Sequence, residues 1–185
     1  MITDIIKDAD GRMGKAAVAL GHEFGTIRTG RAAAQILEPV KVEYYGTPTP
    51  LLQLASVTAP EPQMLVVSPY DRSAMGAIEK AIRTSDLGLN PSNDGQVVRV
   101  PFPPLTEERR RELVKLAKHY AEDARVAVRN IRREANDRLK HAERDHEISQ
   151  DDMRRAEAEV QKLTDAHVKE IDEMLARKEA EIMEV

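Results

Sequence analysis

Apolar residues recur every three or four positions along three long stretches of the chain, a spacing typical of amphipathic helices. The longest stretch, 106–147, contains neither glycine nor proline. About 40 residues at roughly 1.5 Å each predict a rod on the order of 60 Å long. Thr106 is expected to cap its first turn. The apolar positions are Leu113, Leu116, Ala117, Tyr120, Ala124, Val128, Ile131, Ala135 and Ala142.

The two other stretches lie at the ends of the chain. The first covers residues 2–28, with Gly30 as a natural stop, through Ile2, Ile6, Ala9, Met13, Ala16, Leu20, Phe24 and Ile27. The last begins with Ser149 and Asp152, a capping signature, and runs almost to Val185 through Met153, Ala156, Val160, Leu163, His167, Ile171, Met174 and Ile182. Each apolar stripe must be buried against another helix. We therefore expect residues 1–29 and 105–185 to form one antiparallel three-helix bundle.

The middle of the chain has a different pattern, with short apolar runs and all ten prolines. The predicted elements are strands at 40–45, 64–67 and 96–100, a turn at Asn93-Asp94-Gly95, and a short helix through Met75, Ile78, Ala81 and Ile82 capped by Asp71. This predicts a small α/β module (a β/α/β sandwich) inserted at residues 30–104. The fold class is therefore α+β. Helices this long do not fit a compact globule with a radius of gyration of about 16 Å, so we expect an elongated molecule.

Two segments connect the predicted bundle with the inserted module. They are Thr29-Gly30-Arg31 and the stretch that contains Phe102, Pro103, Pro104 and Leu105. A double connection of this kind can act as a hinge, although the prolines equally favour a stiff joint.

Charges on the stretch 106–147 are sorted by face. At about 100° per residue, one line opposite the apolar stripe holds Arg111, Lys115, Lys118, Arg125, Arg129, Arg132, Arg133 and Lys140. The acidic residues Glu112, Asp123, Glu134 and Asp137 fall on a flank, and only Glu122 interrupts the basic line. A helix that needs only solubility usually mixes the two signs through i, i+4 pairs. The sorting indicates that this face meets an extended anion.

The tight set at 125, 129, 132 and 133 keeps four guanidinium groups within reach of one run of phosphates. A solvated or salt-bridged face is the alternative interpretation. Aromatic residues are not interleaved with the arginines, which disfavours single-strand base stacking. Backbone recognition of folded RNA fits the pattern better.

Composition limits the remaining functions. The chain has 185 residues and no cysteine, which excludes disulfides, thiol catalysis and cysteine-based zinc sites. Its net charge of −4 argues against a generally basic nucleic-acid coat, but a local basic face remains possible because residues 145–185 are strongly acidic. No apolar run approaches the roughly 20 residues of a membrane span, and the N-terminus lacks signal-peptide character. We expect a soluble, cytoplasmic protein.

A search for catalytic motifs yields nothing specific. The stretch GTIRTGR at 25–31 resembles a phosphate-binding loop but lacks its lysine and follows a helix rather than a strand. His141 and His146 are five residues apart, which splays them on a helix and favours surface histidines over a metal pair. His167 lies on an apolar seam and is expected to pack in the bundle. We therefore expect no catalytic residue, no metal and no cofactor.

Several motifs together resemble one family. They are VEYYGTPTPLLQLA at 42–55, IEKAIRTSDLGLNP at 78–91, PPLTEERR at 103–110 and RNIRREAND at 129–137, with IRTGR at 27–31. In this order and spacing, the chain closely resembles the bacterial ribosome recycling factors along essentially its whole length. Tyr70, where the family often has another aromatic residue, is a minor departure.

The resemblance implies an L-shaped, tRNA-like monomer that binds the large ribosomal subunit and its RNA after termination, with the bundle across the A and P sites. With elongation factor G and GTP it would split the subunits, and messenger RNA and tRNA would be released. It implies no enzyme activity of its own, and neither DNA nor membrane binding. By the motif match, Arg132 is the arginine on which the family most depends for contacting ribosomal RNA, and Arg129 and Arg133 share the motif.

A competing hypothesis is a helical adaptor that binds partner proteins through its bundle. It predicts self-association or a partner helix. It gives no reason for a separate basic face.

Overall fold

A computed structural model describes residues 1–184, and Val185, at the end of the predicted last helix, lies outside them. The chain divides into two compact units. One contains Met1–Phe24 and Lys115–Glu179, and the other contains Gly25–Val114 and the last residues from Ala180. The expected domain ranges, 1–29 with 105–185 and 30–104, stay a prediction.

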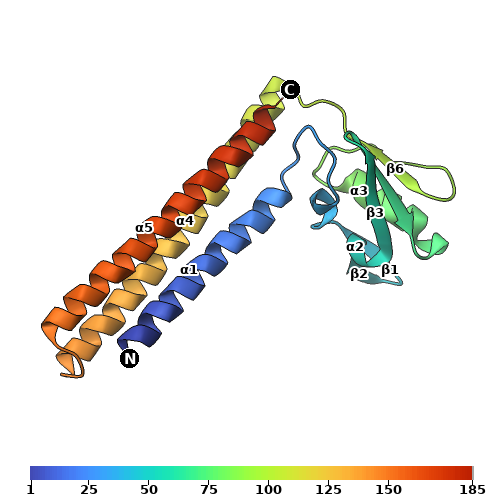
Figure 1. Cartoon of the computed structure of the whole chain (residues 1–185). Coiled ribbons are helices and arrows are strands. Elements are labelled where there is room, and N and C mark those ends of the chain that lie inside the picture. The colour runs from blue at the N-terminus through green and yellow to red at the C-terminus, as the bar shows by residue number, and fades with distance from the viewer. Residues whose placement is uncertain (185) are drawn as a thin grey trace. The chain divides into compact units, whose positions relative to one another are not determined.

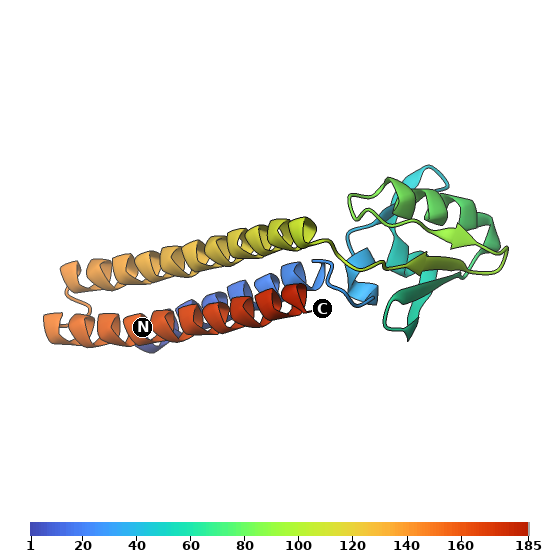
Figure 2. The ribbon, with the colours of Figure 1, turned by 90° about the horizontal axis from the view of Figure 1, so that it is seen from above.

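The greater part of three long helices builds the first unit: α1 (Ile2–Gly25), α4 (Glu107–Arg144) and α5 (Gln150–Met183) lie side by side (Figures 1 and 2). Ion pairs between the helices show the direction in which each helix runs relative to its neighbour. Arg12 of α1 lies 2.6 Å from Glu134, and Arg138 lies 3.2 Å from Asp8, so α4 runs antiparallel to α1. Short turns after Arg144 bring α5 back, parallel to α1. The predicted three-helix bundle is confirmed.

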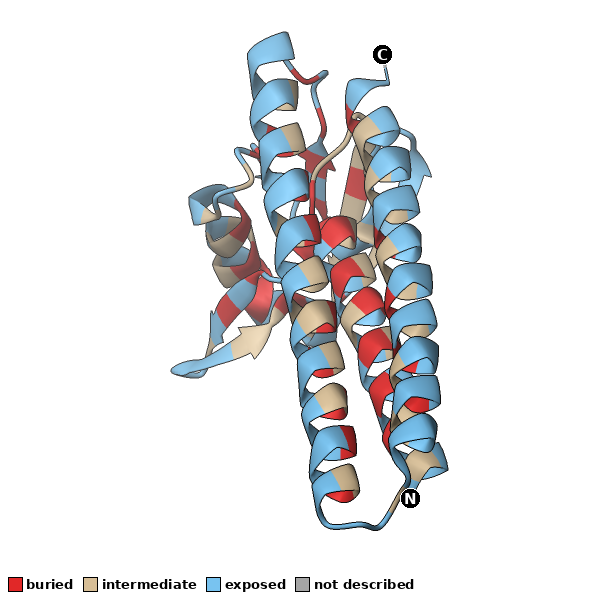
Figure 3. Ribbon diagram, turned by 90° about the vertical axis from the view of Figure 1, so that its left-hand side faces the viewer, coloured by how far each residue is buried: buried red, intermediate tan, exposed pale blue. Residues whose placement is uncertain are grey.

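Small and aliphatic side chains fill the bundle interior, and each helix turns one buried face inward (Figure 3). The buried positions include Ile5, Ala9, Met13, Ala17 and Leu20 of α1, Ala117, Ala121, Val128, Ile131, Ala135, Leu139 and Ala142 of α4, and Ala156, Val160, Thr164 and Ile171 of α5. The many alanines let the backbones approach closely. The Thr164 hydroxyl is satisfied because it donates to the Val160 carbonyl at 2.8 Å.

Both predicted helix caps are present. The Thr106 hydroxyl accepts from the Arg109 amide at 3.1 Å, and the Ser149 hydroxyl accepts from the Asp152 amide at 3.0 Å. Each bond satisfies one of the amides that the first turn of a helix leaves free. These two caps fix where α4 and α5 begin.

The first helix ends earlier than predicted, at Gly25 rather than near residue 28. A Cβ at position 25 would lie 2.0 Å from the Gln35 side chain, so glycine here admits a close neighbour. Ile27 is nevertheless buried, from the loop after the helix. Gly30, the expected stop, therefore lies beyond the helix.

Some of the residues that are buried in the bundle helices also differ from the predicted ones. Ile5 and Ala17 are buried where the sequence pattern favoured Ile6 and Ala16, because a straight helix drifts from a strict seven-residue repeat. In α4, Leu116 is 38% exposed and Leu139, absent from the predicted stripe, is buried.

The second unit contains two antiparallel sheets. Strands β1 (Lys41–Tyr44) and β2 (Thr47–Pro50) form a hairpin, and β3 (Ala55–Glu61), β4 (Met64–Pro69), β6 (Val98–Pro101) and β5 (Ser92–Asn93) form a four-stranded sheet in that order. The helical elements are η1 (Ala34–Leu37), α2 (Leu51–Leu54), η2 (Arg72–Ala74) and α3 (Met75–Thr84). Residues from both sheets and α3 share one core, including Val42, Leu65, Ile78, Ile82 and Val100.

Three strands and the short helix of this unit agree with the prediction, whereas β2, β3 and β5 were missed. The two-residue strand β5 includes Asn93, which was predicted to lie in a turn. Strands β2 and β3 contain prolines, which the sequence pattern treats as breakers. The structure places them where proline is tolerated: β2 pairs on one side only, and β3 is an edge of the four-stranded sheet.

Asp71 caps the short helix η2 and not α3 as predicted, because its carboxylate accepts from the Ser73 amide at 2.9 Å, whereas α3 begins after Ala74 without a side-chain cap. It also accepts from the Tyr44 hydroxyl at 2.8 Å. This hydrogen bond is the main reason that the pKa of Tyr44 is raised to about 12. The contact joins the hairpin to the start of the helical segment.

Candidate RNA-binding face

The cationic side chains that were predicted on one helix face differ in how accessible they are. In the first unit, Lys115, Lys118, Arg133 and Lys140 are exposed, whereas Arg125, Arg129 and Arg132 are half-buried. Arg111 belongs to the second unit, where it is exposed and lies 2.6 Å from Glu107 in the first turns of α4. Sequence spacing placed these residues on one face, but it did not show which of them are paired.

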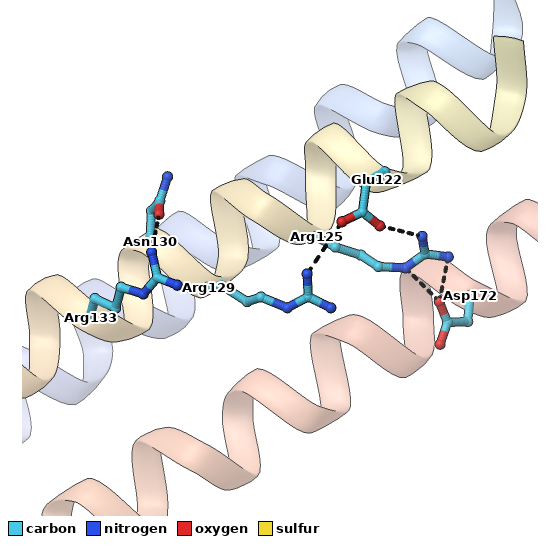
Figure 4. A network of polar contacts seen from close by, with 6 residues as sticks. All are labelled: Glu122, Arg125, Arg129, Asn130, Arg133 and Asp172. Carbon is cyan, nitrogen blue, oxygen red and sulfur yellow. Dashed lines mark hydrogen bonds and ion pairs between the residues drawn. The ribbon is translucent and has the colours of Figure 1, made fainter.

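Arg125 is the most engaged of these arginines, because it lies between two carboxylates (Figure 4). Its Nε and Nη2 lie 2.8 and 2.7 Å from Asp172 Oδ1 of α5, and its Nη1 lies 3.1 Å from Glu122 Oε2. The side chain is only 18% exposed. Burial by itself lowers the pKa of Arg125, but the hydrogen bonds to Asp172 and Glu122 outweigh it and raise the pKa. These contacts favour a structural role that fastens α4 to α5.

Substituting Arg125→Met tests this role. Methionine keeps the apolar stem but removes the pairs with Asp172 and Glu122, so we expect the bundle to lose about 1 kcal/mol of stability. Affinity for RNA is expected to change by less than about twofold, the loss of one weak contact. Thermal unfolding and an RNA-binding titration measure the two effects. A large loss of affinity with unchanged stability would contradict the structural assignment.

The arginines toward the C-terminal half of α4 are more available. Arg129 Nη1 lies 3.3 Å from Glu122 Oε1, and its side chain is 42% exposed. Arg133 donates only to the Asn130 side-chain oxygen, at 3.4 Å (Figure 4). Arg132 makes no ion pair with any residue in the range 1–184. Arg132 and Arg133 can therefore bind an external anion without breaking a salt bridge. Arg129 would have to break only its solvent-exposed salt bridge with Glu122.

His141, His146 and His167 differ in their exposure and contacts. His141 and His146 are exposed, and His146 adopts a positive φ of 57° in the turn after α4. Half-buried His167 lies 2.8 Å from Asp10 of α1 and 3.4 Å from Glu170. It packs in the bundle as predicted, but the hydrogen bond with Asp10 was not predicted, since the sequence did not fix the register of α1 against α5.

Among residues 1–184, no group of histidine, aspartate and glutamate side chains could hold a metal ion. Within the same range, no helix combines the length and the apolar character that a membrane span requires.

The two predicted hinge segments both lie in the second unit. Thr29, Gly30 and Arg31 are outside any helix or strand, as are Phe102 to Leu105. Phe102 is only 1% exposed and belongs to the α/β core, and Leu105 is 8% exposed. The segment 102–105 is therefore anchored to the α/β core through Phe102.

Arg28, which the sequence did not single out, links the two segments. Its guanidinium carbon lies 5.3 Å from the centre of the Phe102 ring, and the group donates to the Pro103 carbonyl. Burial lowers the pKa of Arg28, and the nearby charge of Arg109 adds to this effect. A cation over an aromatic face is favourable, more so when it is partly desolvated. The link holds residues 28 and 102–103 together.

Comparisons with known proteins give a consistent result. The family model described as ribosome recycling factor matches residues 20–183. The chain is 57% identical over 185 residues to the ribosome-recycling factor of Carboxydothermus hydrogenoformans, with all of both chains covered. It is 56% identical over 181 residues to that of Oleidesulfovibrio alaskensis, with 98% of each covered.

Two solved structures are also similar. A solution structure of the ribosome recycling factor has a TM-score of 0.75 and 46% identity, covering 100% of this chain and 98% of the other. A model of the T. thermophilus ribosome recycling factor, with E. coli elongation factor G on the E. coli post-termination complex, has a TM-score of 0.68 and 48% identity over all of both chains.

Proposed function

Because the chain belongs to the ribosome recycling factor family, we propose that it recycles ribosomes after translation termination. It binds the large ribosomal subunit and, together with elongation factor G and GTP, splits the post-termination complex so that mRNA and tRNA are released. It is a translation factor and not an enzyme, since GTP hydrolysis belongs to elongation factor G. The full-length match to proteins of this name is the observation that carries the proposal. A cytoplasmic location follows from this role.

We further propose that the C-terminal half of α4 contacts ribosomal RNA through phosphate groups. Arg132, Arg133 and Arg129 form the centre of this contact, because they are the arginines of the face that are free or weakly paired. Lys115 and Lys118 extend it along the helix, and Arg111 is a further candidate once it leaves Glu107. Guanidinium groups bind phosphate in a bidentate fashion, which suits backbone recognition. Arg125 fastens α4 to α5 and does not itself contact the RNA in this proposal.

A polysome-breakdown assay tests the function directly. Polysomes treated with puromycin are incubated with elongation factor G and GTP, with and without this protein, and monosomes and subunits are quantified on a sucrose gradient. We expect breakdown only when all components are present. Breakdown that is equally fast without the protein would contradict the proposal.

The adaptor hypothesis now has less support. The apolar seams that would bind a partner helix are already buried within the three-helix unit. We therefore propose a monomer, and analytical ultracentrifugation across a range of protein concentrations measures it. Concentration-dependent dimerisation would favour the adaptor.

We also propose that residues 29–31 and 102–105 act as a hinge between bundle and module. Both segments have an irregular backbone, which supports this proposal. The hydrogen bond from Arg28 to the Pro103 carbonyl connects them, so we propose that the hinge turns about this contact. The chain has no cysteine, so Gly30→Cys with Pro103→Cys can be cross-linked selectively. A disulfide between these two cysteines is expected to leave binding to the large subunit unchanged but to slow splitting of the post-termination complex. Reduction of the disulfide should restore the rate of splitting. Undiminished splitting by the cross-linked protein would count against a working hinge.

A further inference from the structure

Glu122 is an acidic residue in the middle of the basic line of α4. Lys115 and Lys118 precede it by seven and four residues, and Arg129, Arg132 and Arg133 follow it. Its side chain is 53% exposed, so its charge is open to solvent and to any ligand of this face. The proposed RNA contact does not explain why a carboxylate should lie here.

The contacts of Glu122 show that it is held in place. Oε2 accepts from Arg125 at 3.1 Å, and Oε1 accepts from Arg129 at 3.3 Å (Figure 4). Arg125 is itself bound to Asp172 of the neighbouring helix. Asp172, Arg125, Glu122 and Arg129 therefore form a row of alternating charges that begins between two helices and ends at the exposed face.

The two links of Glu122 respond differently to an RNA phosphate. The link to Arg129 joins two exposed groups, and such a pair changes an equilibrium by at most about fivefold, so a phosphate can take Arg129 from it. Arg125 is itself bound to Asp172, so its hydrogen bond to Glu122 holds the Glu122 carboxylate in place. A phosphate close to position 122 would therefore meet a fixed negative charge.

We propose that Glu122 is a specificity-determining residue of the RNA-binding face. It divides the cations into a Lys115–Lys118 group and an Arg129–Arg133 group, whose nearer members are about 16 Å apart along the helix axis. A phosphate backbone that follows α4 without interruption is disfavoured at the gap. A folded RNA surface that offers phosphates to each group and none between them is accepted. This inference rests on the proposed contact with ribosomal RNA.

The substitution Glu122→Gln tests the proposal, because it removes the charge and keeps the shape. The probes are a short duplex RNA of arbitrary sequence and purified large ribosomal subunits, each titrated over a range of salt concentrations. We expect affinity for the duplex to rise about three- to fivefold, the effect of one surface ion pair. The slope of log K against log salt should become steeper by about one phosphate contact. The ratio of large-subunit to duplex affinity should fall accordingly.

Asp123→Asn is the matched control. It makes the same change in net charge one residue further along, on the flank of the helix, where Asp123 lies 3.4 Å from His119. We expect a smaller gain in duplex affinity from this variant. The gain should persist when Glu122→Gln is made in an Arg129→Gln background and compared with Arg129→Gln alone, because the proposal attributes it to the fixed charge at position 122 and not to the release of Arg129. Thermal unfolding of each variant controls for the lost Arg125 contact.

Two results would overturn the proposal: duplex affinity that does not rise in Glu122→Gln, or a rise that Asp123→Asn reproduces. A separate measurement tests the RNA-binding face itself. If Arg132→Gln binds large subunits as tightly as the unaltered protein, the proposed contact fails. If Arg132→Gln weakens binding but Glu122→Gln does not alter the affinity ratio, only the specificity role of Glu122 fails.

Discussion

Replacing Arg129 and Arg132 together by glutamate is expected to abolish binding to the large ribosomal subunit. Each arginine loses a charge-assisted contact of about 1.5–3 kcal/mol, and each new carboxylate repels phosphate. The combined loss should exceed about 100-fold in affinity. The fold should survive, because Arg132 has no ion pair within residues 1–184 and Arg129 has only an exposed one. Cosedimentation with purified large subunits measures the loss.

A matched control reverses Arg154 and Arg155, which are exposed on α5 in its acidic first half. The change in net charge is identical, so a general electrostatic effect would weaken both variants equally. We expect the α5 variant to keep most of its affinity. The salt dependence should also differ, with the slope reduced by about two phosphate contacts only when α4 is altered. Equal losses in the two variants would show that the α4 face has no special role.

Replacing Phe102 by alanine is expected to cost about 3–5 kcal/mol of stability in the α/β unit. The ring is 1% exposed, lies in the shared core, and carries the Arg28 guanidinium on its face. Its backbone amide also donates to the Gln63 carbonyl at 2.7 Å, which fixes the ring's position. Since Tyr44, Tyr45 and Tyr70 lie in this unit, tyrosine fluorescence in a urea titration follows its unfolding.

Phe102→Leu separates packing from the other contributions. It retains most of the apolar volume but removes the aromatic face under Arg28, so a loss below about 1.5 kcal/mol is expected. A bundle substitution such as Leu20→Ala should leave the transition reported by these three tyrosines in place. If Phe102→Ala lowered stability by less than about 1 kcal/mol, typical of a weakly packed residue, Phe102 would be a linker residue rather than a core residue.

The long elements of this fold were predictable because a single physical signal dominates them. Apolar periodicity located all three bundle helices, and the hydroxyls of Thr106 and Ser149 located two of their starts. The misses arose where that signal was weak. Helix α1 ends at Gly25, where a Cβ would clash with the Gln35 side chain, a neighbour that no local pattern encodes. Strands with Pro48, Pro50 and Pro60 looked irregular because strand propensity says nothing about edge positions.

The proposed RNA-binding face was predictable as a set of cations on one helix, but the contacts of each side chain were not. Spacing grouped Arg129, Arg132 and Arg133 correctly on α4. It did not show that Asp172 on another helix binds Arg125, because the register between α4 and α5 depends on how their apolar stripes interlock. The same limit hid Arg28, whose partners lie about 75 residues away. Sequence patterns therefore identified the cations, and only the packing showed which of them are available.

The position of α1 in the bundle has a consequence for how the chain folds as it is made. Asp10 meets His167, 157 residues later in the sequence. At synthesis rates of about 5–20 residues per second, α1 leaves the ribosome roughly 8–30 s before that partner exists. Until then its apolar seam lacks the α5 side of the bundle, and even α4, whose Glu134 and Arg138 pair with α1, is made only after most of the α/β unit. The bundle should close last, in a slow step that joins distant contacts, and protease sensitivity of stalled nascent chains of increasing length would show when α1 becomes protected.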